Sequence, residues 1–122
     1  MTSKTAESRA KDIIGDAAWE EMSNAASGGS ISGPQMRNVA WALPTDKKNK
    51  IGGEHDRRIL EKGTSANETE MRNILADWFR YGEMPEDRAG ALGVLIKAFK
   101  ENDNRPLAKD LEKIKDNPQQ VQ

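Results

Sequence analysis

Apolar residues recur along this chain at the three- and four-residue intervals of an α-helix. The clearest stripe occupies positions i, i+3, i+4 and i+7 of the stretch 67–81: Met71, Ile74, Leu75 and Trp78. Because an α-helix has about 3.6 residues per turn, these side chains share one helix face. Gly82 follows and predicts the end of the helix. We therefore expect a helix over 67–81 whose tryptophan lies in the core.

Similar stripes predict further helices over 2–16, 17–26, 36–43 and 54–62, a helix opened by Pro85 and a last one from Asn104. The apolar residues expected inside them are Ala6, Ala10, Ile13, Ala17, Trp19, Met22, Ala26, Met36, Val39, Ala40, Leu43, Ile59, Leu60, Leu92, Leu95, Ile96, Phe99, Leu107, Leu111 and Ile114. No segment alternates apolar and polar residues, so we expect no strands.

Helix ends and loops are predicted by glycine, proline and capping residues. Gly15 predicts a break after the first helix, with Asp16 as N-cap of the second, and Gly63 is the expected C-cap of the 54–62 helix. The stretches 27–33 and 45–53 are predicted to be loops. Their paired glycines, 28–29 and 52–53, lack the strand-loop-helix context of a phosphate-binding loop and are interpreted as turns. Residues 117–122 are expected to fray.

Composition favours one domain spanning 1–122, with a core over about 4–116. The chain has 122 residues, 32% of them charged, a net charge of −1 and no cysteine. These values exclude a disulfide scaffold and a Cys-ligated zinc site, and give no bulk attraction to nucleic acid or anionic membrane. No apolar run approaches the roughly 20 residues of a transmembrane helix. We expect a soluble, cytoplasmic chain.

Candidate catalytic chemistry is nearly absent from the sequence. The one histidine, His55, has no adjacent nucleophile and is expected at the surface or partly packed. Adjacent carboxylates such as Glu20 and Glu21 point about 100° apart on a helix and do not form a pair. We expect no enzyme activity, metal, cofactor or small-molecule substrate. Trp19 and Trp78 are expected in the core, whereas Trp41 lies off its stripe and is expected to be partly buried rather than a partner contact.

Charge is unevenly distributed along the chain. The segments 1–26 and 81–90 are acidic, whereas residues 45–62 contain six basic side chains. These are Lys47, Lys48, Lys50, Arg57, Arg58 and Lys62. Unlike charges on one domain suit head-to-tail association, although an ordinary solvated surface explains them equally well.

Several of these helices, spread over about 100 residues, resemble those of a death domain. The similar segments are Trp19-Glu-Glu-Met-Ser-Asn-Ala-Ala, Asp56-Arg-Arg-Ile-Leu-Glu-Lys-Gly63, Met71-Arg-Asn-Ile-Leu-Ala-Asp-Trp78, Ala91-Leu-Gly-Val-Leu-Ile-Lys-Ala-Phe99 and Leu107-Ala-Lys-Asp-Leu111. They look like the second to sixth helices of that family. The stretch 27–53 is longer than the family pattern and adds a short helix, which is similar to the insertions of Tube- and Pelle-type Toll-pathway death domains.

The resemblance implies an all-α, six-helix antiparallel Greek-key bundle with an extra short helix between the second and third helices. It also implies an adaptor in signal transduction, of the innate-immunity or apoptosis kind, that binds other death-domain proteins and has no enzymatic activity. By position, the expected partner-binding residues are Arg57, Arg58, Glu61, Lys62, Arg80, Glu83, Glu86, Asp87 and Arg88. Two alternatives are a small helical DNA-binding domain, with Lys47–Arg58 as its basic patch, and a helical regulatory or phage-type protein with a private partner.

Overall fold

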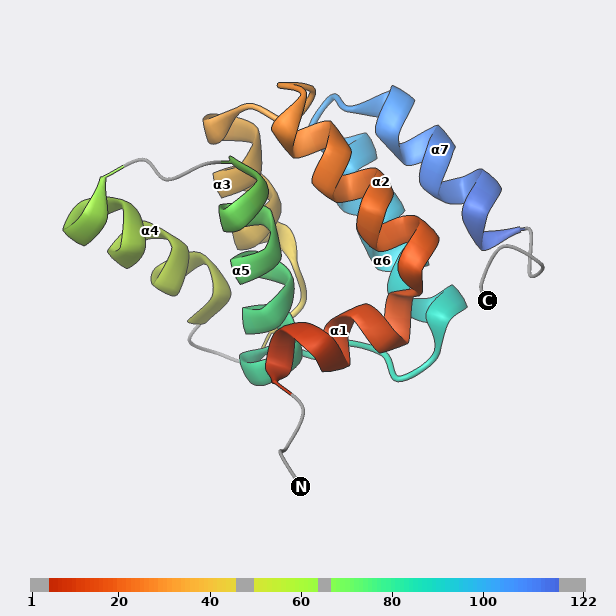
Figure 1. The fold of residues 1–122 in the computed structure, drawn as a ribbon, viewed down its shortest axis with the longest axis horizontal. Coiled ribbons are helices and arrows are strands. Elements are labelled where there is room, and N and C mark those ends of the chain that lie inside the picture. The colour runs from red at the N-terminus through yellow and green to blue at the C-terminus, as the bar shows by residue number, and fades with distance from the viewer. Residues whose placement is uncertain (1–4, 46–49, 64–66, 117–122) are drawn as a thin grey trace.

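The computed structural model describes residues 5–45, 50–63 and 67–116. Over these residues the regular secondary structure is entirely α-helical, with no β-strand. The helices are α1 (Ala6–Ile14), α2 (Asp16–Ser27), α3 (Gly33–Ala42), α4 (Lys50–Lys62), α5 (Asn67–Tyr81), α6 (Arg88–Glu101) and α7 (Arg105–Lys115). In Figure 1, α4 lies at one edge of the molecule and α7 at the other, with α5 and α2 between them. The predicted all-α class is thus confirmed.

The core forms around α5, whose apolar stripe is buried as predicted: Met71, Ile74, Leu75 and Trp78. This helix packs against α1, α2, α3 and α4. Helices α6 and α7 pack on each other; α6 also packs on α1, and α7 also packs on α2. The stripes of α2, α3 and α6 are also buried, so the periodicity identified these inward faces correctly. In α1 only Ala10 of the expected stripe is fully buried, and Ile14, which was not predicted, is buried beside it.

The junction between α1 and α2 is a single glycine. Gly15 has a φ of 89°, and its N–H donates to the carbonyl of Lys11 at 2.8 Å. A positive φ is unstrained only for glycine, which is why the break falls at this residue. The prediction of Asp16 as N-cap was wrong, because Gly15 occupies that position and Asp16 is the first residue of α2.

Side-chain caps fix the starts of α6 and α7. Asn104 was predicted correctly: its Oδ1 accepts from Leu107 N–H at 3.4 Å, and its Nδ2 donates to Ser30 carbonyl at 3.0 Å. The helix expected from Pro85 begins instead at Arg88, because Asp87 is the N-cap and its carboxylate accepts from Gly90 N–H at 2.8 Å. The hydrogen bond from Asn104 to Ser30 joins the start of α7 to the loop between α2 and α3.

The loop predicted over 45–53 was wrong for its last four residues, which belong to α4. Ile51 is fully buried, and burying it stabilises helix at a place where two glycines predicted a turn. Gly52 lies directly against the indole of Trp41 on α3, where no larger residue fits. Lys47 and Lys48 lie outside the described residues.

The two glycines of α4 give a matched test of this packing. Gly52→Ala is expected to destabilise the protein, because a methyl group there would overlap the Trp41 ring and displace it from its hydrogen bond with Asp56. A Cβ at Gly53 meets no atom within 4 Å, so Gly53→Ala should stabilise by about 0.5–1 kcal/mol through helix propensity alone. Urea unfolding followed by circular dichroism measures both; stabilisation by both variants would contradict the contact.

Candidate protein-interaction surface

Helix α4 presents two different faces. Because successive residues are rotated by about 100°, Glu54, Arg57, Arg58 and Glu61 share one face and His55, Asp56, Ile59 and Leu60 the other. The first face lines a polar cleft of about 460 Å³ that also involves α1 and α5. The second face lines an apolar groove of about 520 Å³ that also involves α3 and α5. We call these the polar cleft and the apolar groove.

A buried ionic network holds α4 to α5. Arg58 donates to both oxygens of Glu70, at 3.1 and 2.7 Å, and to Asp77 at 2.6 Å. The Arg58 side chain is 16% exposed, and the two carboxylates 4% each. Charge-assisted hydrogen bonds of this bidentate kind fix orientation as well as contributing energy. Arg58, expected as a partner contact, is therefore engaged inside the domain.

His55 joins the same network. It was expected at the surface or partly packed, but it is only 4% exposed, and its Nδ1 lies 2.6 Å from Glu70 Oε2. An ionised carboxylate can only accept, so we assign the hydrogen of the pair to Nδ1. The partner is fifteen positions away on another helix, which no spacing in the sequence indicated. His55 is buried and not at the surface because Glu70, on another helix, gives its Nδ1 a hydrogen-bond partner.

The two carboxylates of the network have opposite pKa shifts. Burial would raise the pKa of Glu70, but hydrogen bonds from His55 and Arg58, together with the charge of Arg58, outweigh burial and lower it. Burial raises the pKa of Asp77, and Arg58 offsets that rise only in part. Arg58 thus favours the ionised form of both groups.

The polar cleft brings together three of the predicted partner residues: Arg57, Arg58 and Arg80. Arg57 donates to Glu54 at 2.6 Å and to Glu61 at 3.1 Å, all on the exposed face of α4. Arg80 is exposed and donates to Asp77 at 3.3 Å, so it lies beside the buried network. For Lys62 the backbone belongs to α4, and its side chain lies outside the described residues.

Of the remaining predicted residues, Glu83, Glu86 and Asp87 lie between α5 and α6, and Arg88 is the first residue of α6. We call the exposed pair Glu83 and Glu86 the acidic corner. Glu83 N–H donates to Pro44 carbonyl at 2.9 Å, next to an isolated bridge between Thr45 and Gly82. Asp87 is occupied as the α6 cap. Arg88 donates to the carbonyls of Ile114 and Lys115 at 2.9 and 3.3 Å, joining α6 to the end of α7.

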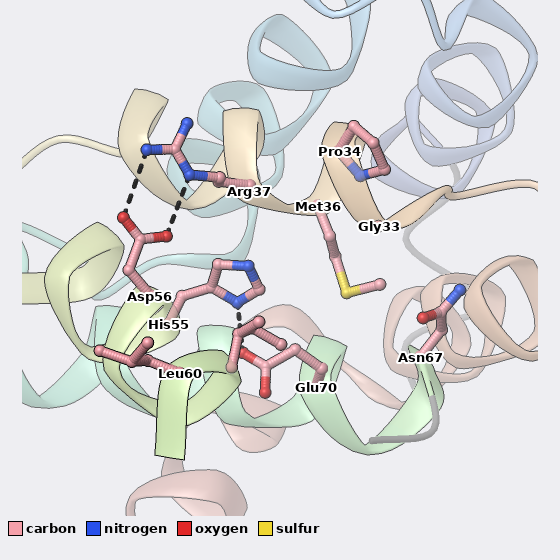
Figure 2. Close-up of a pocket in the computed structure, with 10 residues that line it drawn as sticks. Gly33, Pro34, Met36, Arg37, His55, Asp56, Leu60, Asn67 and Glu70 are labelled. Atoms are coloured by element: carbon pink, nitrogen blue, oxygen red, sulfur yellow. Dashed lines mark hydrogen bonds and ion pairs between the residues drawn. The ribbon is translucent and has the colours of Figure 1, made fainter. Parts of the chain in front are cut away.

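The apolar groove was not predicted from the sequence. Figure 2 shows the Met36 side chain of α3 between His55 of α4 and Asn67 of α5, with Glu70 of α5 below them and Leu60 of α4 on the side away from Asn67. Leu60 was expected in the core, but its side chain is 86% exposed at the groove's edge, because α4 turns His55 inward instead. Arg37 and Asp56, joined at 3.0 and 3.3 Å, close one rim.

Trp41 was predicted to be partly buried, but it is one of the exposed large hydrophobic residues of the described chain. Its ring is 41% exposed, its Nε1 donates to Asp56 at 3.2 Å, and the Arg37 guanidinium lies 5.9 Å from the ring centroid. Asp56 therefore accepts from two α3 residues at once and fastens α3 to α4.

Comparisons with known proteins give no family model, no curated protein and no solved structure that matches this chain. Within 5–45, 50–63 and 67–116, no group of three or more His, Cys, Asp or Glu side chains is placed to hold a metal ion. None of the helices in these ranges has the length and hydropathy required to span a membrane.

Proposed function

We propose that this chain is a death-domain-like interaction module that works in the cytoplasm and assembles signalling complexes by homotypic binding. The observation that supports this most is the shared core of the helices that carry the resemblance. In four of the five similar segments the apolar anchors are buried in one cluster, whereas the segment 56–63 leaves Leu60 exposed: the buried anchors are Trp19, Met71, Trp78, Leu92, Phe99, Leu107 and Leu111. With these anchors buried, charged residues of the same helices are left on the surface to make contacts.

The surface offers exposed arginines at the polar cleft, among carboxylates of the same lining, and exposed glutamates at a separate place. Arg57 and Arg80 are exposed at the polar cleft, where the buried network holds the helices that carry them. Glu83 and Glu86 are exposed at the acidic corner. Binding of the cleft on one copy to the corner on the next gives a head-to-tail assembly. Each exposed pair contributes only about 0–1 kcal/mol, so association should be weak and weaken further with salt.

A charge-swap experiment tests this arrangement. Sedimentation velocity of the domain at high concentration and low salt should show self-association that high salt reduces. The cleft variant Arg57→Glu/Arg80→Glu and the corner variant Glu83→Lys/Glu86→Lys should each fail to self-associate, and their mixture should regain association through the intact patch of each. Arg105→Glu/Lys109→Glu on exposed positions of α7 makes the same charge change as the cleft variant and should leave association intact.

Mixing the domain with candidate death domains extends the test to heterotypic partners. Association that requires the cleft or the corner supports the proposal. Absence of association with itself and with every candidate, at low salt and high concentration, would overturn it.

A further inference from the structure

A third side of α4, between those that line the cleft and the groove, faces away from α3 and α5 at the edge of the molecule (Figure 1). Gly53, Arg57 and Leu60 are exposed there, with Asp56 partly exposed beside them, and we call these four residues the outer face. Gly53 and Leu60 are seven residues apart, so two helix turns place them on the same side. The Leu60 side chain is 86% exposed and therefore contacts little of its own chain.

The other exposed large apolar residues of the described chain lie beside the start of the same helix. Trp41 packs its indole against Gly52 and is 41% exposed. Tyr81 is 36% exposed, and its ring centroid lies 5.3 Å from Lys50 Nζ. Exposed apolar surface thus gathers around α4, with Trp41 and Tyr81 near its start and Leu60 near its end. Apolar side chains gathered in this way mark an interaction surface, unlike single scattered ones.

Gly53 leaves an open position close to that start. Glycine in the middle of a helix costs about 1 kcal/mol relative to alanine. At Gly52 the indole of Trp41 requires glycine, but a Cβ at Gly53 meets no atom within 4 Å, so no packing inside the chain requires it. A glycine on an exposed helix face allows another molecule to approach the backbone closely. Gly53 therefore provides a hole on the face where Leu60 provides a knob.

We propose that the outer face of α4 binds the same face of a second copy of the chain. The two helices run antiparallel about a two-fold axis midway between residues 56 and 57. In that register Leu60 of each copy packs over Gly53 of the other, at the end of the helix where Trp41 and Tyr81 are exposed. An isologous contact requires one face to supply both the knob and the hole. A second copy is the occupant that this face selects, because the same two residues satisfy each other twice.

The charges along the pair are complementary in the same register. Lys50 lies about two positions from Glu61 of the second copy, on one flank of the contact. Arg57 lies about two positions from Glu54 of the second copy, on the same flank. Within each copy Arg57 already donates to both glutamates, so the pair joins two existing rows of ion pairs. Opposite charges placed in this way favour one register of a helix pair over others.

Two features keep the pair weak. On the other flank the two Asp56 carboxylates approach each other, although each is already held by Arg37 and Trp41 of its own chain. One helix face also buries much less than the roughly 1,200–2,000 Å² of a stable interface. We therefore expect a transient dimer, too weak for sedimentation of the free domain to detect and populated where copies are held close together. It does not depend on the head-to-tail assembly proposed above.

Disulfide capture measures such a transient pair, and the chain contains no cysteine of its own. A Gly53→Cys chain is mixed with an equal amount of a Leu60→Cys chain in a glutathione redox buffer, and the disulfides are quantified by intact mass. Both positions are exposed, so both chains should fold. A disulfide requires Cα atoms within about 7 Å, whereas cysteines at the same position of both copies lie roughly 10 Å apart along the pair.

Random collision gives the mixed disulfide about twice as often as either same-site disulfide. The proposed register should raise that ratio to on the order of ten or more, because in the mixed pair the second Leu60 still packs over the second Gly53. Arg105→Cys, at an exposed position of α7, is the matched control and should give only the random ratio with Gly53→Cys. Leu60→Asp added to the Gly53→Cys chain removes the second knob and should lower the ratio towards the random value.

All these chains also carry Glu83→Lys/Glu86→Lys, which removes the head-to-tail contact. A mixed excess in this background, together with no salt-dependent association of the wild-type chain, overturns the proposed function and supports the helix pair. The random ratio for positions 53 and 60 would overturn the helix pair. An excess of same-site disulfides, as a parallel pair gives, or a mixed excess that Leu60→Asp does not lower, would overturn it equally.

Discussion

Replacing Trp78 by alanine is expected to lower the free energy of unfolding by about 3–5 kcal/mol, the range found for buried aromatic side chains. The indole is fully buried in the centre of the cluster formed around α5, so its removal leaves a large cavity. Natural domains are stable by only about 5–15 kcal/mol, so the variant should be close to unfolded at 37 °C. Urea denaturation followed by circular dichroism measures the loss.

A second substitution at Trp78 separates volume from polarity. Its Nε1 is buried and has no hydrogen-bond partner among the described residues. Trp78→Phe removes this unpaired N–H along with part of the ring, so the gain from the first effect should offset some of the cavity cost. We therefore expect Trp78→Phe to lose clearly less stability than Trp78→Ala. If alanine cost no more than about 1 kcal/mol, as a surface change does, the ring could not lie in the core.

The second large effect is expected at Arg58. Arg58→Met should destabilise the protein by about 3–5 kcal/mol, the usual cost of removing one partner from a buried ionic network. Methionine replaces the apolar part of the side chain, but Glu70 and Asp77 are left as buried carboxylates without the guanidinium that each accepts from. Arg58→Lys keeps the charge but cannot reach both carboxylates with a planar fork, so its loss should be intermediate.

The pH dependence of the Arg58→Met loss identifies its cause. In the wild-type chain the lowered pKa of Glu70 gives stability that is present above its unfolded-state pKa and is lost as pH falls through the acidic range. In the variant both carboxyl pKa values rise, so the folded state binds protons more readily and regains stability as pH falls. The difference between variant and wild type should therefore shrink towards acidic pH. A difference that stays constant with pH would assign the loss to packing.

Arg57→Met is the matched control for Arg58. Arg57 is the preceding residue of the same helix, with the same chemical change, but its partners Glu54 and Glu61 are both on the solvent-facing side of α4. Exposed ion pairs contribute little, so this variant should unfold close to the wild-type midpoint at every pH. A larger loss at position 58 than at position 57 would show that the buried Arg58 network, and not the exposed ion pairs of Arg57, carries the electrostatic stabilisation of α4.

The sequence predicted the helices wherever an apolar stripe was long and regular. The stripe of α5, from Met71 to Trp78, and the stripe of α6 are buried as expected, because helical spacing and burial reinforce each other. The prediction failed at Gly52-Gly53, where intrinsic propensity favours a turn. There the contact of Gly52 with Trp41 and the burial of Ile51 override propensity, and neither contact is visible in local sequence.

The candidate site was less predictable than the fold. Arg57, Arg80, Glu83 and Glu86 lie on the surface, where partner contacts are possible, but the position of a charge on a helix does not say whether it pairs inside the domain. Arg58 and His55 are the examples: both are used to bind Glu70, which α5 brings from another part of the chain. Leu60 shows the reverse, since an apolar residue next to Ile59 is left at the rim of a groove.

The unequal packing of α4 and α5 has a consequence for the dynamics of the domain. Helix α5 packs on α1, α2, α3 and α4, so we expect its amide hydrogens to exchange only when the whole domain unfolds. Helix α4 packs on α3 and α5 at the edge of the molecule, so its local opening would have to break the contacts with both helices. The helix that lines both the cleft and the groove therefore opens only when the Arg58–Glu70 pairing breaks and the Ile51 side chain leaves the core.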